Sequence, residues 1–517
     1  MKKIIVLLTL CGILTNTTAQ NKEFSSAHKL QAAEYLIHNL YVDSLNENTL
    51  VEAAIRGMIS SLDPHSSYST PEEVKLFKES VAGEFVGIGI QYQFYKDTLY
   101  VIKTIKDGPS QKAGVKAGDR IITINGEATP KNVAISDVSA LLRGPKGSKV
   151  EVGVLREENT QLIPITIKRD KIPVESLMAS YMITPEIGYI NLNQFGRHSH
   201  EEFLKALKDL KKQKMASLIL DLRGNSGGLL NISVDIANEF LNAKERIVYA
   251  NGQSVDLGSF YAKGDGKFKD GKLIILQDEA SASASEILAG AIQDWDRGLI
   301  IGRRSFGKGL VQRPLDLPDG SMIRLTIARY YTPSGRYIQK PYEKGADGQR
   351  NYRHEILERL DRGELIQADS IHQIDSLQFH TLNKGRMVYG GGGIMPDVFM
   401  PIDSIYLDKE FQKVSRNDLF QTTYLSYITQ NQTKIRSEYN EDEFISSYKV
   451  PTDMLQKIMG DVNREDIQDE IERILKALIG RSIYSDDLYY RINNETDPVI
   501  LKAISILQSD QYEKFLN

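Results

Sequence analysis

The sequence predicts a multidomain α/β protein in which a mostly-β module precedes the largest domain and helical regions lie at both ends. Its 517 residues leave room for three or four domains of roughly 150 residues. Strand-like and helix-like segments alternate from about residue 175 to 400, which is typical of an α/β layer with buried parallel strands. Between 83 and 170, short β-rich runs are separated by Gly, Asn and Asp turns, which predicts a compact module.

The N-terminus has the three-part pattern of a secretory signal peptide over residues 1–19. Two lysines precede an apolar run of 11 residues, and cleavage after Ala19 would place small residues at the −3 and −1 positions. The run is shorter than the roughly 20 residues that cross a bilayer. An N-terminal anchor helix and a lipid anchor on Cys11 are the alternatives, although Leu10 stands where a lipid anchor needs a small residue. We expect an exported, periplasmic protein, soluble or membrane-associated, that uses no disulfide because the only cysteine is removed.

Composition excludes several classes of protein. Hydrophobic residues make up 41% and charged residues 26%, which excludes wholesale disorder. Lys and Arg number 64 against 68 Asp and Glu, so the chain has no net positive charge that would indicate nucleic-acid binding. The 39 glycines follow no repeat, which excludes a fibrous protein.

The first two regions after the signal are predicted as a helical region over 24–82 and the mostly-β module over 83–170. Helical apolar spacing is broken at 63–67, and Pro71 marks another helix start. Within the module, the pattern predicts one helix over 135–142 and strands over 86–90, 99–102, 120–124 and 150–154.

The α/β core is predicted over 171–403, with a helical C-terminal region over 404–517. Residues 341–386 are polar and charged and are interpreted as an insertion. The clearest helix of the tail carries apolar residues from 467 to 478 and is expected to end at Gly480. Within the core we expect strands over 187–192, 218–222 and 273–276 and helices over 199–213, 228–242 and 284–293.

A serine-rich turn at 281–286 follows the apolar strand 273–276 and opens an apolar helix. A serine at a helix N-terminus lies near a partial positive charge and free N–H groups. Taken alone, such serines are most simply helix caps, and Ser285 fits the cap role better than Ser283. Ser283 is therefore the candidate nucleophile.

A nucleophilic serine needs a base, and no histidine falls in the core segments near this turn. Neither a G-x-S-x-G elbow nor a His-Glu-x-x-His pair occurs. Lys308, framed by glycines and followed by apolar residues, can act as a base if burial lowers its pKa toward neutrality. If 308–312 is extended, Gln312 shares a face with Lys308, and its neutral amide can orient the amine without holding it protonated.

A third pattern is the buried strand 218–222 that runs into the glycine-rich loop 224–228. Such a loop presents backbone N–H groups, as an oxyanion hole requires. It lacks the G-x-x-x-x-G-K-[ST] spacing of a phosphate loop, so nucleotide binding is not expected.

Together these motifs resemble those of the C-terminal processing peptidases, also called tail-specific proteases. The resemblance rests on Ser-Ala-Ser-Ala-Ser-Glu-Ile, Gly-Lys-Gly-x-Val-Gln and Asp-Leu-Arg-x-Asn-x-Gly-Gly, together with Tyr-Tyr-Thr-Pro-Ser-Gly-Arg at 330–336 and Gly-Gly-Ile-Met-Pro-Asp-Val at 392–398. It covers roughly residues 30–400, and the insertion and the tail depart from it. It implies a crotonase-like α/β core, related to that of Clp-type peptidases, and a PDZ domain over 83–170.

The resemblance also implies site residues, with no metal and no cofactor. Ser283 would be the nucleophile, Lys308 the general base, and Gln312 the residue that positions Lys308. Asp294 matches an acidic position implicated in some members, although a helix-end carboxylate explains it equally well. The oxyanion hole would use backbone N–H groups of Gly227 or Gly228 and of Ala284. The carboxylate-binding loop of the PDZ domain would be formed by Gly87, Ile88, Gly89 and Ile90. Arg143 would be a gating residue.

Three functions compete. The first is an exported serine endopeptidase that cuts proteins near their C-termini and recognises apolar C-terminal tails through the PDZ domain. The second is an inactive PDZ scaffold, against which the presence of Ser283, Lys308 and Gln312 argues. The third is a crotonase-fold enzyme acting on acyl thioesters, for which no coenzyme A pocket is found. Expected partners are protein or peptide substrates, not nucleic acid, with a homo-oligomer or an adaptor protein as further partners.

Overall fold

The computed structural model describes residues 25–517 except 96–97, 131–134, 157–160 and 372–376. The expected signal peptide, with Cys11, lies outside these described residues and stays a prediction. Among the helices that the structure describes, none is long and apolar enough to cross a membrane.

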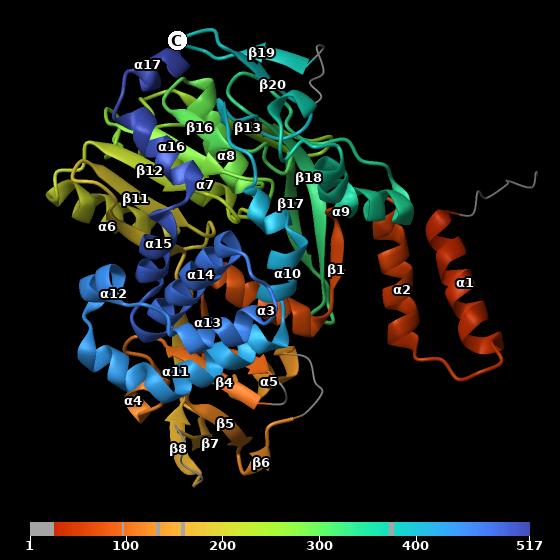
Figure 1. Cartoon of the computed structure of the whole chain (residues 1–517). Helices are drawn as coiled ribbons and strands as arrows, with labels where there is room; N and C mark the ends of the chain where they lie inside the picture. The colour runs from red at the N-terminus through yellow and green to blue at the C-terminus, as the bar shows by residue number, and fades with distance from the viewer. Residues whose placement is uncertain (1–24, 96–97, 131–134, 157–160, 372–376) are drawn as a thin grey trace, which may run out of the picture.

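A six-stranded sheet of order β10-β11-β12-β15-β16-β21 lies in the upper half of the molecule in the view of Figure 1. All neighbouring pairs are parallel except β10–β11, and the central strands are buried runs rich in Ile and Leu, as a sheet covered on both faces requires. The strands are β10 (Leu177–Met182), β11 (Ile187–Leu192), β12 (Ser217–Asp221), β15 (Lys272–Gln277), β16 (Leu299–Gly302) and β21 (Val398–Phe399).

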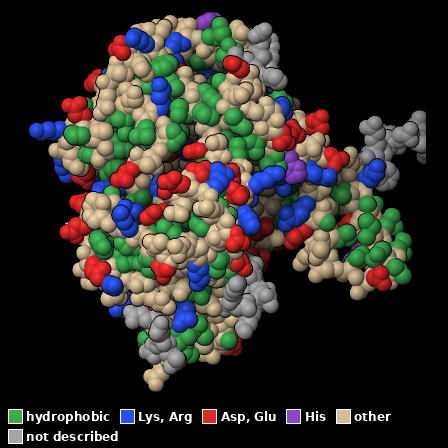
Figure 2. All heavy atoms as spheres, in the orientation of Figure 1, with side chains coloured by type: hydrophobic (Ala, Val, Ile, Leu, Met, Phe, Trp, Pro, Cys, Tyr) green, Lys and Arg blue, Asp and Glu red, His purple; other side chains and the backbone are tan. Residues whose placement is uncertain are grey.

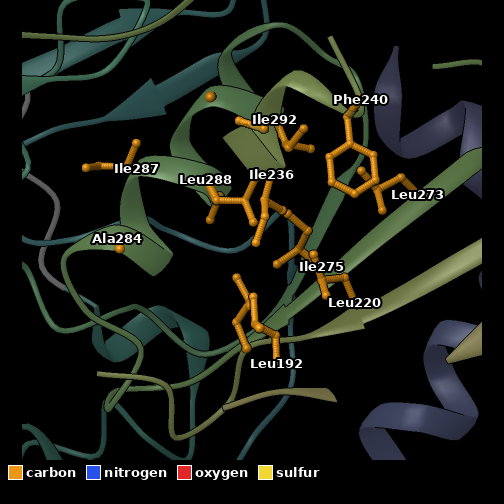
Figure 3. Close-up of a cluster of buried hydrophobic side chains, with 14 of the residues drawn as sticks. Leu192, Leu220, Ile236, Phe240, Leu273, Ile275, Ala284, Ile287, Leu288 and Ile292 are labelled. Atoms are coloured by element: carbon orange, nitrogen blue, oxygen red, sulfur yellow. The ribbon is translucent and has the colours of Figure 1, made fainter. Parts of the chain in front are cut away.

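Helices cover both faces of this sheet. The first face carries α6 (Ser199–Lys212), α7 (Leu230–Asn238) and α8 (Ala284–Asp294), whose apolar side chains meet those of the strands in one cluster. Figure 3 shows the part of this cluster that α7 and α8 contribute. The second face carries α16 (Pro498–Leu507) and α17 (Gln511–Leu516). The three helices of the first face were predicted, whereas the completion of the core by the last twenty residues of the tail was not.

Helix α7 is shorter than the predicted 228–242. Gly227 and Gly228 have φ of +105° and +148°, so the chain is still non-helical there, and Gly228 forms a parallel bridge with Phe195. At the other end, the N–H groups of Glu239 and Phe240 bond to carbonyls three residues earlier, which closes the helix in a tighter turn.

A second sheet of order β1-β18-β13-β14, with β17 paired to β18, stands beside the first. Its strand β1 follows the break in helical spacing that the sequence shows at 63–67, where Asp63 accepts the N–H groups of His65 and Ser66 and the chain turns onto β18. The strands are β1 (Ser67–Ser69), β13 (Arg246–Asn251), β14 (Asp256–Tyr261), β17 (Leu310–Asp316) and β18 (Met322–Tyr331).

Three helices make up the rest of the N-terminal region: α1 (Ser26–Leu40), α2 (Glu47–Ser60) and α3 (Pro71–Ala82). Figures 1 and 2 show α1 and α2 projecting from the body of the molecule. Helix α1 has no buried residue, and its apolar side chains are exposed, Leu40 by 75%. In contrast, α3 lies against the body, with Val74 buried.

The module of residues 83–170 is a sheet of order β3-β4-β5-β7-β8 with β6 on β5, and helix α5 is where the sequence predicts it. The expected strand over 86–90 is interrupted at Gly89, whose φ of +74° separates β2, paired with β9, from β3, paired with β4. The elements are β2 (Glu84–Gly87), β3 (Ile90–Tyr95), β4 (Thr98–Thr104), α4 (Pro109–Ala113), β5 (Arg120–Ile124), β6 (Glu127–Ala128), α5 (Ile135–Leu142), β7 (Lys149–Leu155), β8 (Ile163–Lys168) and β9 (Asp170–Pro173).

A helical bundle formed by the C-terminal region packs on this module through Tyr95, Tyr100 and Ile102. The prediction that α14 ends at Gly480 is wrong, since the helix continues to Ile483. A Cβ at position 480 would lie 2.9 Å from Leu488, so the glycine permits close helix packing. The bundle comprises η3 (Ser404–Leu407), α10 (Lys409–Ser415), α11 (Asp418–Glu438), α12 (Glu441–Ser447), α13 (Thr452–Met459), α14 (Glu465–Ile483) and α15 (Asp486–Asn494).

The predicted insertion, 341–386, contains α9 (Gly345–Asp361), η1 (Ala368–Ser370) and β19 (Gln378–His380), which pairs with β20 (Met387–Tyr389). It is packed on the body of the protein. Tyr352 and Arg359 of α9 are buried, and Arg359 forms an ion pair with Glu364 at 2.8 Å.

Candidate active site

Ser283 lies at the N-terminus of α8, in the turn that follows β15. Its φ of +56° and ψ of −110° are rare for a residue with a side chain, and such strain persists only where the surroundings impose it. Ser283 is the N-cap of α8, which corrects the expectation that Ser285 caps this helix. Ser285 instead lies inside the first turn.

The hydroxyls of the other two serines in this turn, Ser281 and Ser285, donate hydrogen bonds to backbone carbonyl oxygens. Ser281 Oγ donates to the carbonyl oxygen of Leu222 at 2.8 Å, and Ser285 Oγ donates to that of Asn225 at 2.8 Å. The hydroxyl of Ser283 donates to no other residue in the described part of the chain. Of the three, therefore, Ser283 alone has a hydroxyl proton available for transfer.

Lys308 occupies a turn before β17, next to Gly307 with φ of +88°. Its Nζ donates to Gln312 Oε1 at 3.1 Å, so the two side chains meet as the sequence predicts for an extended 308–312. Burial lowers the pKa of Lys308, the nearby charge of Arg324 lowers it further, and Glu286 opposes the shift. The amine is thereby biased toward the neutral form that accepts a proton.

Glu286, fully buried in the first turn of α8, connects the serine turn to the lysine turn. Its Oε2 accepts the N–H groups of Ser283 at 2.8 Å and Lys308 at 2.9 Å. Its Oε1 accepts the Gly307 N–H and the Ser305 hydroxyl, each at 2.6 Å. One carboxylate thus fixes both candidate catalytic residues by their backbones. Sequence reasoning included Glu286 in the serine motif without giving it this role.

Ser283 and Lys308 line one cleft of about 390 Å³. Ser283 Oγ and Lys308 Nζ share the cleft, but no hydrogen bond joins them among the described atoms. Apolar side chains from six different segments supply most of the wall: Phe77, Val81, Phe195, Leu229, Leu230, Ile287, Leu310, Val311, Pro314 and Tyr330. The contribution of α3, through Phe77 and Val81, was not predicted from the sequence.

The glycine-rich loop lies directly against the serine turn. A Cβ on Gly227 would be 2.7 Å from the Ala282 carbonyl oxygen, so only glycine allows this approach. The Gly227 N–H donates to Asn225 Oδ1 at 2.8 Å. The N–H groups of Gly228 and Ala284 have no partner in the described part of the chain. Gly228 lines the cleft, and the Ala284 nitrogen lies next to Gly227, 3.0 Å from where a Cβ on that residue would be.

Asp294 lies at the opposite end of α8 from Ser283, about 16 Å along the helix at 1.5 Å per residue. Its carboxylate forms a fully buried ion pair with Arg336 and accepts the Ser334 N–H at 2.8 Å. Asp294 therefore holds the 332–336 turn against the helix, and does not line the cleft.

His65 and Tyr330 also reach this site without having been assigned a role from the sequence. The Tyr330 hydroxyl donates to the carbonyl oxygens of Lys308 and, at 3.2 Å, Ser283. His65 comes from the N-terminal region, and its carbonyl oxygen accepts the Gln312 amide. No described histidine of the core segments near the serine turn lines the cleft. The contact between His65 and Gln312 joins residues 247 apart in the sequence, so no local pattern predicts it.

The module of residues 83–170 carries a groove of about 510 Å³ between β3 and α5, lined by Gly87, Ile88, Gly89 and Ile90. Arg143 borders the groove, forms an ion pair with Glu79 of α3 and lies 4.6 Å from the ring centre of Phe85. In this structure Arg143 therefore contacts α3, and not the sheet that carries the cleft. Among the described residues, no group of three or more His, Cys, Asp and Glu is arranged to hold a metal ion.

Comparison with known families matches four parts of the chain. Residues 186–345 match peptidase family S41, 101–156 match the PDZ domain, and 10–72 match the N-terminal domain of the activating protease CtpB. Residues 411–486 match a family of unknown function.

The relatives are similarly named. Carboxy-terminal processing protease CtpB of Bacillus subtilis is 34% identical over 325 residues, which are 62% of this chain and 67% of that protein. A carboxy-terminal-processing protease of Bartonella bacilliformis is 38% identical over 307 residues, 59% of this chain and 70% of that protein. The solved photosystem II D1 C-terminal processing protease is 30% identical, with a TM-score of 0.36, covering 60% of this chain and 83% of that one.

Proposed function

The chain belongs to the carboxy-terminal processing proteases of peptidase family S41, and from this premise we propose that Ser283 and Lys308 are its catalytic dyad. One observation carries the proposal: the serine whose hydroxyl proton is uncommitted shares a cleft with a half-buried lysine, and this burial lowers the pKa of the lysine. Glu286 holds the backbones of both residues.

The neutral amine of Lys308 takes the proton of Ser283 Oγ as the oxygen attacks the scissile carbonyl carbon. The negative charge that develops on the carbonyl oxygen is stabilised by the N–H groups of Gly228 and Ala284, the donors left free in the loop and helix. The lysine then gives its proton to the leaving amine. Water, deprotonated by the same lysine, hydrolyses the acyl-enzyme and restores Ser283.

Gln312 positions the amine by accepting a hydrogen bond from it. As a neutral amide it does not favour the charged form as a carboxylate would, so the lysine can lose its proton. Since Ser283 Oγ and Lys308 Nζ are not bonded to each other here, substrate binding is proposed to complete the dyad.

The PDZ domain supplies substrate recognition. An extended C-terminal peptide can add to the free edge of β3, with its carboxylate at the loop Gly87–Ile90 and apolar side chains against Ile88, Ile90 and Leu142. We propose substrates with apolar C-terminal tails, cut after export to the periplasm, where a removable signal over residues 1–19 would deliver the enzyme.

Digestion of an unstructured protein with an apolar tail tests the activity. Mass spectrometry of the products is expected to show cleavage near the C-terminus, and blocking the tail carboxylate by amidation is expected to slow it. Binding of the tail without any product would identify a PDZ scaffold and contradict the proposed function.

Binding of a C-terminal tail to the PDZ domain is expected to raise the rate of peptide cleavage in the cleft. Arg143 connects the PDZ groove to α3, whose Phe77 and Val81 form part of the cleft wall, so a tail that displaces Arg143 from Glu79 can move that wall. The measurement is cleavage of a short chromogenic peptide that does not bind the PDZ domain, with and without a tail peptide. Stimulation in the wild type and its loss in Arg143→Ala are expected. Equal rates under all four conditions would make the PDZ domain a passive tether.

A further inference from the structure

The hydroxyl of Tyr352 lies where two hydrogen-bonded paths to Lys308 meet. Tyr352 belongs to α9, in the segment 341–386 whose role the sequence leaves open, and it is buried. Its hydroxyl is 2.8 Å from His65 Nε2 and 3.0 Å from Gln339 Nε2. Helix α9 contacts α2 of the N-terminal region, beside which it lies in Figure 1.

The first path runs through His65 and Gln312. The carbonyl oxygen of His65 accepts from Gln312 Nε2, and Gln312 Oε1 accepts from Lys308 Nζ at 3.1 Å. Because the two ends of an amide differ, fixing the nitrogen at His65 directs the oxygen toward the lysine. Tyr352 anchors the His65 ring, while Asp63 Oδ1 accepts the His65 N–H at 2.9 Å.

The second path runs through Gln339. Its Nε2 donates to the Tyr352 hydroxyl, and its Oε1 accepts the N–H of Gly309, the residue after Lys308, at 2.9 Å. Tyr352 therefore supports the lysine from two sides: the first path holds the amide that orients the amine, and the second holds the backbone of the turn.

His65 and Tyr352, the two titratable residues on these paths, stay neutral. Burial, and secondly the charge of Lys308, lower the pKa of His65 to about 3, so its ring is uncharged at ordinary pH. Burial raises the pKa of Tyr352. Neutral groups hold the lysine in place without the charge that a carboxylate would set beside it, which would favour the protonated amine.

We propose that Tyr352 is a positioning residue for Lys308 and Gln312. Through it, the inserted segment 341–386 holds these two residues in place from outside the cleft. The inference rests on the proposed function, because it takes Lys308 as the base. Tyr352 does not line the cleft and has no direct contact with substrate to lose.

The test is Tyr352→Phe in the full-length protein, assayed on the chromogenic peptide. The ring and its contacts with Phe306 and Lys340 remain, and only the hydroxyl is lost. We expect kcat to fall about tenfold through misplacement of the amine, with KM within about twofold. The matched control is Tyr342→Phe, from the same segment, which also contacts the Tyr352 ring. The Tyr342 hydroxyl bonds to no described residue, so the kcat of this variant should equal that of the wild type.

A double-mutant cycle with Gln312→Ala separates positioning from general destabilisation. If Tyr352 acts mainly through Gln312, Tyr352→Phe should lower kcat by less than about threefold in the Gln312→Ala background, where only the path through Gln339 remains. An unchanged kcat, a change in KM alone, or the same tenfold loss in both backgrounds would overturn the proposal. Should Tyr352→Phe lower the folded fraction, His65→Phe removes the hydrogen bond of the first path from the other side, keeps that of Gln339, and is expected to lower kcat by the share of the loss that the first path carries. Full activity of Lys308→Ala would instead refute the proposed function itself.

Discussion

Ser283→Ala is expected to abolish peptidase activity, by a factor on the order of 10⁴ or more, while the protein stays folded. The hydroxyl is the proposed nucleophile, and neither a water molecule nor a neighbouring serine can replace it at the strained turn. Loss of the N-cap should cost only about 1 kcal/mol of stability. Hydrolysis of the chromogenic peptide and thermal unfolding of the same sample measure the two effects separately.

The matched controls are Ser281→Ala and Ser285→Ala. Their hydroxyls are buried and donate to backbone carbonyl groups, so each substitution should lower stability by about 1–2 kcal/mol and activity by less than about tenfold. Ser283→Ala is therefore expected to be the least active of the three variants, and Ser281→Ala and Ser285→Ala the less stable ones. An inactive Ser281 or Ser285 variant beside an active Ser283 variant would refute the choice of nucleophile.

The parts of the fold that the sequence predicted are those with a local signal. Strands β12 and β15 are short runs of Ile and Leu, and α6 shows apolar residues at helical spacing, so their types and near bounds follow from periodicity. The PDZ strands are likewise bounded by turn residues. Gly480 misled because a glycine near the end of a helical pattern is usually a cap, whereas here it makes room for another helix.

The parts that were missed depend on contacts between distant segments. Helices α16 and α17, at the end of the tail, cover the second face of the core sheet. Helix α3, from the N-terminal region, supplies part of the cleft wall. The same holds within the site. Ser283, Lys308 and Gln312 stand in recognisable motifs, but the connection through Glu286 and the path from Tyr352 through His65 emerge only when these segments are folded together.

The choice of Ser283 over Ser285 also shows the limit of capping rules. Propensity alone assigned the cap to Ser285, because the apolar helix follows it directly. The structure caps the helix with Ser283 and gives the Ser285 hydroxyl to Asn225, the residue that also orients the glycine loop. A strained, positive φ at Ser283 is a feature that no propensity scale predicts.

Lys308→Arg is expected to be almost as inactive as Lys308→Ala, with losses on the order of 10³ or more. Arginine keeps its proton at any usable pH, so it cannot accept one from Ser283 although its charge and length are similar. A lysine that only held substrate by its charge would be replaced well by arginine. Comparable activity of the arginine variant and the wild type would therefore refute the assignment of Lys308 as the base.

The pH dependence of the wild type tests the same assignment without a substitution. The reaction needs the neutral amine, so activity should rise with pH as Lys308 loses its proton and then level off. Burial lowers the pKa of Lys308, which places this rise below the ordinary lysine range. His65, with a pKa of about 3, does not produce a rise there. A profile of kcat/KM that rises only in the ordinary lysine range would mean that burial does not activate Lys308. A flat profile across the range below it would mean that no lysine limits the reaction.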